Sequence, residues 1–257
     1  MISKSRTIAA SGLAVAIAMA GIAAAGPTGA DLNEARVVSK VKPSKLDKKR
    51  FKPISVLLGV VNSPDSAGNE IANPAAERIA WSKNVNVNLS KAPRCTAPLA
   101  NGTTPAFAKS QCPAKSFLGS GDATVHGPGS LPQCGGTPCV IADPVVSVFN
   151  GPGRSQLRLH TYDQDLGAAS PIVNARIVRA NRQERRKGYG QALSVPHAPV
   201  TATLKITSFN STILKSRKVA TAKCKPKQFK VLRRVTYTDG SSETASKTQK
   251  CKVKRRR

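Results

Sequence analysis

Ser120, Asp122 and His126 bring the three residue types of a nucleophilic triad into one short segment. We predict that this segment is a β-strand, on which the three side chains would share a face. At about 3.3 Å per residue, Ser120 and His126 would then stand roughly 20 Å apart. A working triad needs direct hydrogen bonds between its members, and Gly119-Ser120-Gly121 lacks the G-x-S-x-G pattern of a nucleophile elbow. The spacing therefore argues against a serine hydrolase.

A second candidate is the run from His160 to Asp165, which places a histidine beside the carboxylates Asp163 and Asp165. Such a set could hold a divalent cation or act as an acid and base. However, alternation along 156–162 predicts His160 on the polar face of a strand that ends in an acidic turn. His197, between two prolines, falls in a predicted loop. We therefore predict no catalytic, cofactor-binding or metal-binding residue, and no cofactor.

The first thirty residues have the composition of a signal peptide. Lys4 and Arg6 precede an uncharged apolar run over 8–25, and small residues at 23–25 and 28–30 offer two cleavage sites. The alternative is an uncleaved anchor, since about 18 apolar residues lie near the lower limit for spanning a bilayer. We expect cleavage, a secreted or surface-associated protein, and no transmembrane anchor afterwards.

Six cysteines follow in the predicted mature chain, and an exported chain favours disulfides. Their spacing suggests three local couples among the 15 possible pairings. The alternative is zinc, but Cys134 and Cys139 have four residues between them rather than two. The disulfide candidates are Cys95 with Cys112, Cys134 with Cys139, and Cys224 with Cys251.

The charge is strongly positive. Losing Lys4 and Arg6 with the signal peptide lowers the formal charge from +28 to +26, and residues 215–257 alone carry a net +14. Such a surface attracts polyanions. Nucleic acid is an unlikely partner because aromatic residues for base stacking make up only 4% of the chain. We expect anionic envelope polymers or acidic polysaccharides instead, with the alternative that the charge serves only solubility.

Short apolar and alternating runs, separated by Gly, Pro and Asn, predict an all-β fold. We expect an antiparallel, β-sandwich-like domain over 31–257, with an N-terminal signal helix and at most one short helix near 104–116. Two packed halves are the alternative to one domain. The predicted strands are 35–41, 54–61, 84–89, 121–126, 140–150, 156–162, 172–178, 191–195 and 201–209, followed by a C-terminal pair.

That pair is a basic hairpin over about 224–253, in which 228–238 and 242–253 flank Asp239-Gly240. Phe229, Val231, Val235 and Tyr237 share one face, interrupted only by Arg233. A two-residue turn would place Cys251 opposite Gln228. The segment 225–227 would then have to fold back for Cys224 to reach Cys251, or the register must differ.

Several turn and strand-end motifs resemble a set of uncharacterised secreted proteins common in actinobacterial soil lineages. They are Val41-Lys42-Pro43-Ser44-Lys45-Leu46, Phe117-Leu118-Gly119-Ser120-Gly121, Phe149-Asn150-Gly151, Gly188-Tyr189-Gly190, Val195-Pro196, Tyr237-Thr238-Asp239-Gly240-Ser241 and Gln249-Lys250-Cys251. The resemblance implies an exported β-rich protein of unknown function and supplies no site residue. The Cys134/Cys139 loop departs from that pattern.

The hypothesis from the sequence is a secreted, non-enzymatic β-sandwich protein that associates with the anionic cell envelope or extracellular matrix. Two alternatives stay open. One is an extracellular hydrolase of unrecognised type, in which His160 or Asp163 would be essential. The other is a cationic nucleic-acid-binding or antimicrobial protein. The oligomeric state does not follow from the sequence.

Overall fold

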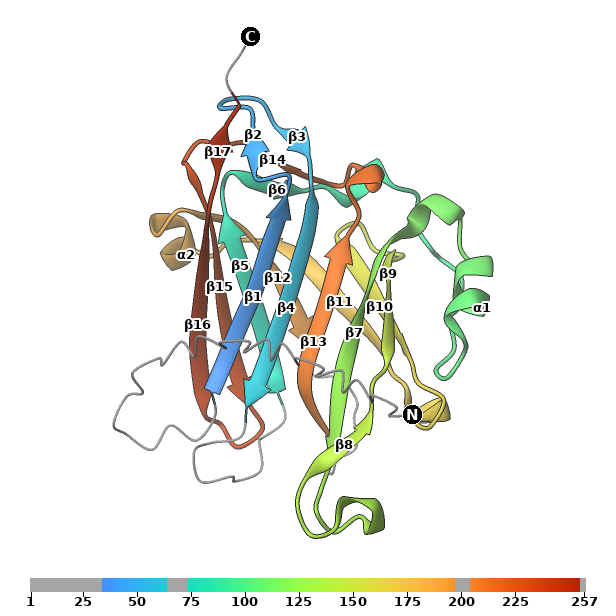
Figure 1. Ribbon diagram of the computed structural model, residues 1–257. Helices are drawn as coiled ribbons and strands as arrows, with labels where there is room; N and C mark the ends of the chain where they lie inside the picture. Colours follow the sequence, from blue (N-terminus) through green and yellow to red (C-terminus); the bar gives the residue numbers. More distant parts are fainter. Residues whose placement is uncertain (1–33, 64–73, 197–203, 255–257) are drawn as a thin grey trace, which may run out of the picture. The chain divides into compact units, whose positions relative to one another are not determined.

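A computed structural model describes residues 34–63, 74–196 and 204–254 (Figure 1). The chain divides into two compact units, 1–30 and 31–257, and all described residues belong to the second. The predicted signal peptide with its helix, His197 and the last three arginines lie outside the described residues.

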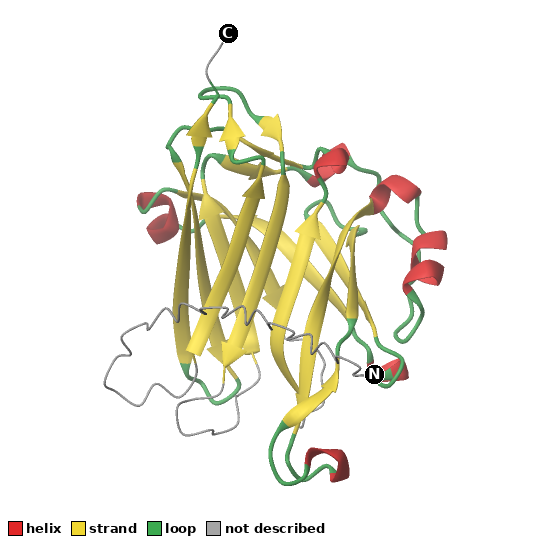
Figure 2. Cartoon of the chain, viewed as in Figure 1, coloured by secondary structure: helices red, strands yellow, loops and turns green. Residues whose placement is uncertain are grey.

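The described chain consists mainly of β-strands with a few short helices around them (Figure 2). The strands are β1 (Glu34–Lys42), β2 (Lys45–Leu46), β3 (Lys52–Pro53), β4 (Ser55–Ser63), β5 (Pro74–Ser82), β6 (Val85–Val87), β7 (Phe117–Gly127), β8 (Cys139–Ala142), β9 (Val145–Asn150), β10 (Gln156–Tyr162), β11 (Ile172–Arg179), β12 (Tyr189–Pro196), β13 (Lys205–Ile213), β14 (Ala220–Ala222), β15 (Gln228–Tyr237), β16 (Ser242–Lys250) and β17 (Lys252–Val253). The helices are α1 (Pro105–Ser110) and α2 (Arg182–Arg186), with 3-10 turns at Leu89–Lys91, Ala114–Ser116, Pro132–Cys134, Gly167–Ala169 and Lys215–Arg217.

The long strands form one antiparallel sheet in the order β1-β4-β13-β7-β9-β10-β11-β12-β5-β15-β16, with β8 paired to β7. The sheet bends until its two edges meet, so that β1 and β4 pass in front of β5 and β12 in Figure 1. Gln249 on β16 joins the edges: its side chain accepts from Val41 N at 2.7 Å and donates to Val41 O at 3.0 Å. The predicted all-β antiparallel class is confirmed, and the layers expected of a sandwich are two halves of one nearly closed barrel.

Inward-facing side chains from these strands form the main core. Alternation places Leu157 and Leu159 inside, where they join Val146 and Val148 in one buried apolar cluster. Two smaller clusters lie outside the barrel. One packs Ala80 and Leu232 with Ala180, and the other packs Phe149 with the Cys95–Cys112 disulfide.

Most predicted strands are present, but two expectations were wrong. The predicted strand 140–150 is two strands, β8 and β9, because Asp143-Pro144 interrupts it. Strand β5 was not predicted, since Pro74-Ala75-Ala76-Glu77-Arg78 contains few β-favouring residues. Burial on both faces of its second half stabilises it instead: Ile79, Ala80, Trp81 and Ser82 are all buried.

The expectation of at most one short helix was also wrong. Helix α1 lies where it was predicted, and Thr104 Oγ1 accepts from Phe107 N at 3.2 Å at its start. Helix α2 was missed, although Asn181 and Glu184 form a capping box at its N-terminus. That pattern was the sequence signal for this helix.

All three predicted disulfides are present, with Cα–Cα distances of 5.0 Å for Cys95–Cys112, 5.2 Å for Cys134–Cys139 and 5.6 Å for Cys224–Cys251. No described cysteine is free.

The C-terminal hairpin is confirmed, with a register one residue away from the simple one. Tyr237 N donates to Ser241 O at 2.9 Å, and Gly240 has φ 84°, so the loop is longer than two residues. Lys250 therefore lies opposite Gln228, and Cys251 N donates to Lys227 O at 2.9 Å. Cys224 thus reaches Cys251 through the segment 225–227, with a Cα–Cα distance of 5.6 Å.

Candidate polyanion-binding surface

Ser120, Asp122 and His126 all belong to β7, in line along one strand. Asp122 pairs with a different residue, accepting from Asn210 Nδ2 at 3.2 Å. No hydrogen bond joins two members of the set within the described part of the chain. The geometry does not form a triad.

His160 was expected on the polar face of its strand. It does point away from Leu157 and Leu159, but the segment that contains α1 covers it, and its exposure is 0%. Thr103 Oγ1 lies 2.9 Å from its Nε2. Burial lowers the pKa of His160, which keeps the ring neutral near pH 7.

Asp163 has a structural role in the turn after β10. Its Oδ1 accepts from Asp165 N at 2.8 Å and Leu166 N at 3.2 Å, and its Oδ2 accepts from Asp143 N at 3.2 Å. These contacts hold the turn rather than an acid–base pair with His160. Within residues 34–63, 74–196 and 204–254, no three His, Cys, Asp or Glu side chains gather where they could hold a metal ion.

Arg233, which interrupts the apolar face of the hairpin, points into the barrel and has an exposure of 0%. Its Nε donates to the carboxylate of Glu77 on β5. Its Nη2 donates to Asn62 Oδ1 at 2.7 Å, and its Nη1 donates to Val61 O at 3.0 Å. Burial raises the pKa of Glu77, and the Arg233 guanidinium opposes that rise. One cation of the basic C-terminal segment is therefore internal and paired.

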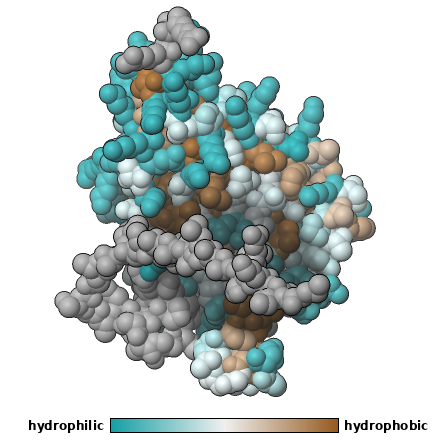
Figure 3. All heavy atoms as spheres, in the orientation of Figure 1, coloured by the Kyte–Doolittle hydropathy of each residue, from teal (hydrophilic) through white to brown (hydrophobic). Residues whose placement is uncertain are grey.

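Four other cations of that segment lie at one end of the barrel, together with six cations from 42–52. We call this region the basic cap and define it by ten exposed side chains: Lys42, Lys45, Lys48, Lys49, Arg50, Lys52, Lys225, Lys227, Lys252 and Lys254. Figure 1 shows its strands β2, β3, β14 and β17 together at that end, and Figure 3 shows hydrophilic residues gathered there.

The cap is assembled from segments far apart in the sequence. Strand β17 pairs in parallel with β2, which places Lys252 opposite Lys45, and β14 pairs with β3. Cys224 N donates to Asp47 O at 2.8 Å, and the Cys224–Cys251 disulfide closes the C-terminal side. These contacts hold the backbone of the cap, while its charged side chains extend into solvent.

Carboxylates are scarce in the cap. Asp47 is the only acidic residue in 42–52, and the segments 223–227 and 250–254 contain none. Asp47 Oδ1 accepts from Lys49 N and Arg50 N, both at 2.8 Å, and so caps the turn that these residues form. One carboxylate beside ten cations leaves a large local excess of positive charge.

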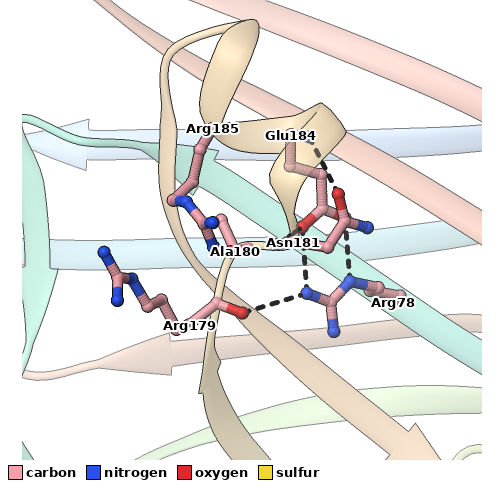
Figure 4. A network of polar contacts seen from close by, with 6 residues as sticks. All are labelled: Arg78, Arg179, Ala180, Asn181, Glu184 and Arg185. Carbon is pink, nitrogen blue, oxygen red and sulfur yellow. Dashed lines mark hydrogen bonds and ion pairs between the residues drawn. The ribbon is translucent and has the colours of Figure 1, made fainter.

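A second cationic region surrounds α2. We call it the α2 surface, and its exposed cations are Arg176, Arg179, Arg182, Arg185, Arg186 and Lys187. Unlike the cap, it is built around a buried carboxylate, Glu184, whose oxygens accept from Arg78 Nε at 2.8 Å and Nη2 at 2.9 Å (Figure 4). Arg185 is also engaged, donating to Ala180 O at 2.6 Å.

Hydrogen bonds from Arg78, followed by one from the Asn181 backbone, lower the pKa of Glu184 although burial opposes this. The carboxylate is therefore ionised at neutral pH and fixes α2 to β5.

Neither a protein-family model, nor a curated protein, nor a solved structure matches this chain. The resemblance drawn from its turn motifs stays a prediction. Among the described residues, no helix has the length and apolar character needed to cross a membrane.

Proposed function

We propose that this is an exported, non-enzymatic protein that binds anionic polymers of the cell envelope or extracellular matrix through the basic cap. The observation that carries the proposal is the set of ten exposed cations with a single carboxylate among them. Six paired cysteines and the apolar N-terminal run support an extracellular location.

The residue types in the cap favour a charged polymer over a discrete small anion. Nine of its ten cations are lysines, which act as flexible point charges, whereas bidentate recognition of one phosphate or carboxylate favours arginine. Charges spread over one end of a barrel suit a ligand with repeated negative groups. Binding to such a ligand releases counterions and so depends steeply on salt.

The test is co-sedimentation of the purified, oxidised protein with isolated cell envelopes over a salt series. The cap variant changes Lys48, Lys49, Arg50 and Lys52 to Gln; the matched α2 variant changes Arg179, Arg182, Arg186 and Lys187 to Gln. Both lose four exposed charges. We expect the cap variant to lose roughly tenfold or more in affinity at physiological salt, and the α2 variant to lose clearly less.

Equal losses in both variants would mean that the protein adheres through its total charge, and the proposed role of the cap would be wrong. Replacing envelopes with duplex DNA in the same series tests the nucleic-acid alternative. Tighter retention on DNA at matched salt would favour that alternative.

A further inference from the structure

The interior of the barrel contains a cavity of about 140 Å³. Six of its lining residues come from strands on opposite sides of the barrel: Val148, Leu157, Leu159, Ile177, Phe209 and Phe229. Protein interiors pack as densely as organic crystals and leave few voids larger than a water molecule. An apolar cavity of this scale, on the order of 150 Å³, is large enough to take up benzene.

Trp81 lines this cavity and is 8% exposed. Its Nε1 is buried and has no hydrogen-bond partner in the part of the chain that the structure describes. A buried indole N–H normally finds an acceptor, and this N–H can only donate. A ligand in the cavity with a hydrogen-bond acceptor would supply the missing partner.

The polar groups at the cavity wall argue for an uncharged ligand. Glu77 and Asn62 line it, but both are engaged by Arg233. All three guanidinium nitrogens of Arg233 already donate to the protein, and Glu77 balances its charge. Lys230 also contributes to the lining, but it alternates along β15 with the inward-facing Phe229 and Val231 and is half-buried, so its ammonium group points away from the cavity. A carboxylate inside would therefore be buried without a charged partner, which is costly.

We propose that the barrel interior binds a small, uncharged, mainly apolar molecule whose single hydrogen-bond acceptor engages the indole N–H of Trp81. This site is separate from the basic cap, and its ligand is of the opposite chemical kind. Binding here is expected to be insensitive to salt and unchanged in the cap variant.

Three probes test the proposal with the purified, oxidised protein: cyclohexanone, methylenecyclohexane, which has a similar shape without the oxygen, and cyclohexanecarboxylate. Trp81 is the only tryptophan in the chain, so its emission reports directly on the cavity. We expect saturable binding of cyclohexanone with a shift in Trp81 emission, and no saturable binding of the carboxylate.

Calorimetric titration of the Trp81→Phe variant isolates the hydrogen bond. The ratio of the two Kd values, ketone to hydrocarbon, is expected to rise about fivefold on losing the N–H, the effect of one ordinary hydrogen bond. Using the ratio cancels the different hydration of the two probes.

A second variant, Val148→Ile, adds a methyl group to the cavity wall and keeps the test valid if Trp81→Phe does not fold. It is expected to weaken both uncharged probes. The proposal is overturned if neither uncharged probe binds saturably, if the carboxylate binds as well as the ketone, or if Trp81→Phe leaves the ratio unchanged.

Discussion

In the basic cap, ten exposed cations surround one carboxylate whose Oδ1 caps a turn, whereas on the α2 surface six exposed cations surround the buried, ion-paired Glu184. Arginines at the α2 surface partly hold the fold together: Arg78 on β5 binds Glu184 of the helix, and Arg185 donates to Ala180 O just before the helix. The cap is instead held by its backbone and a disulfide, and its side chains are left to solvent.

The same contrast applies to the whole described chain. Several of its few carboxylates lie at structural contacts: Glu77 pairs with Arg233, Glu184 with Arg78, and Glu243 with the Tyr237 hydroxyl. Asp163 and Asp239 cap turns. In a protein with 13 acidic and 41 basic residues, these described acids stabilise the fold, and one end of the barrel is left cationic.

The largest expected effect concerns the disulfide that holds the cap. Changing Cys224 and Cys251 to Ala opens a loop with a sequence separation of 27 residues, and should lower the free energy of unfolding by about 3 kcal/mol. Envelope binding should also fall, although no charge is lost, because the cap segments are no longer held together. Urea unfolding and co-sedimentation measure the two effects.

Changing Cys95 and Cys112 to Ala is the matched control, since that disulfide lies under α1 and closes a loop with a separation of 17 residues. It should cost a similar free energy of unfolding and leave envelope binding intact. Undiminished binding by the protein without Cys224–Cys251 would show that the arrangement of the cap does not matter.

A smaller effect is expected from Glu184→Gln, which removes the ion pair with Arg78 and weakens the capping box of α2. We expect a loss of about 2 kcal/mol in the free energy of unfolding at pH 7, because Arg78 loses its charged partner. The exposed neighbour Arg182→Gln should change stability by less than about 0.5 kcal/mol. Equal effects of the two substitutions would contradict the structural role of the α2 cluster.

The stability contributed by Glu184 should also depend on pH, in a direction that its lowered pKa fixes. Because the folded protein lowers the pKa of Glu184, its contribution to stability is complete above the unfolded pKa and is lost as pH falls through the folded value. The difference between the parent protein and Glu184→Gln should therefore shrink below about pH 4.5. Unfolding curves from pH 7 to pH 3 measure it.

Local signals in the sequence predicted much of the fold. The spacing of the cysteines predicted all three disulfides, and Asp239-Gly240 between two alternating runs predicted the hairpin. The alternation also placed Arg233 on the apolar face, which was the signal that its charge is internal.

Features that depend on distant contacts could not be predicted in this way. Strand β5 has weak local preference and forms because the sheet and α2 bury it, so Glu77 and Trp81 were missed with it. The charged run 45–50 contains no local signal of a binding surface. Only the pairing of β2 with β17, about 200 residues away in sequence, brings it beside the C-terminal lysines.

The smallest expected effect separates binding from stability. Surface substitutions away from structural contacts usually change stability by less than about 0.5 kcal/mol, and the cap variant removes four such charges. Its neutral side chains also relieve repulsion between like charges, so any change should be a slight stabilisation that disappears as salt rises. Thermal unfolding at low and high salt measures it. A clear destabilisation would mean that these lysines hold the cap together, and the contrast with the α2 surface would no longer stand.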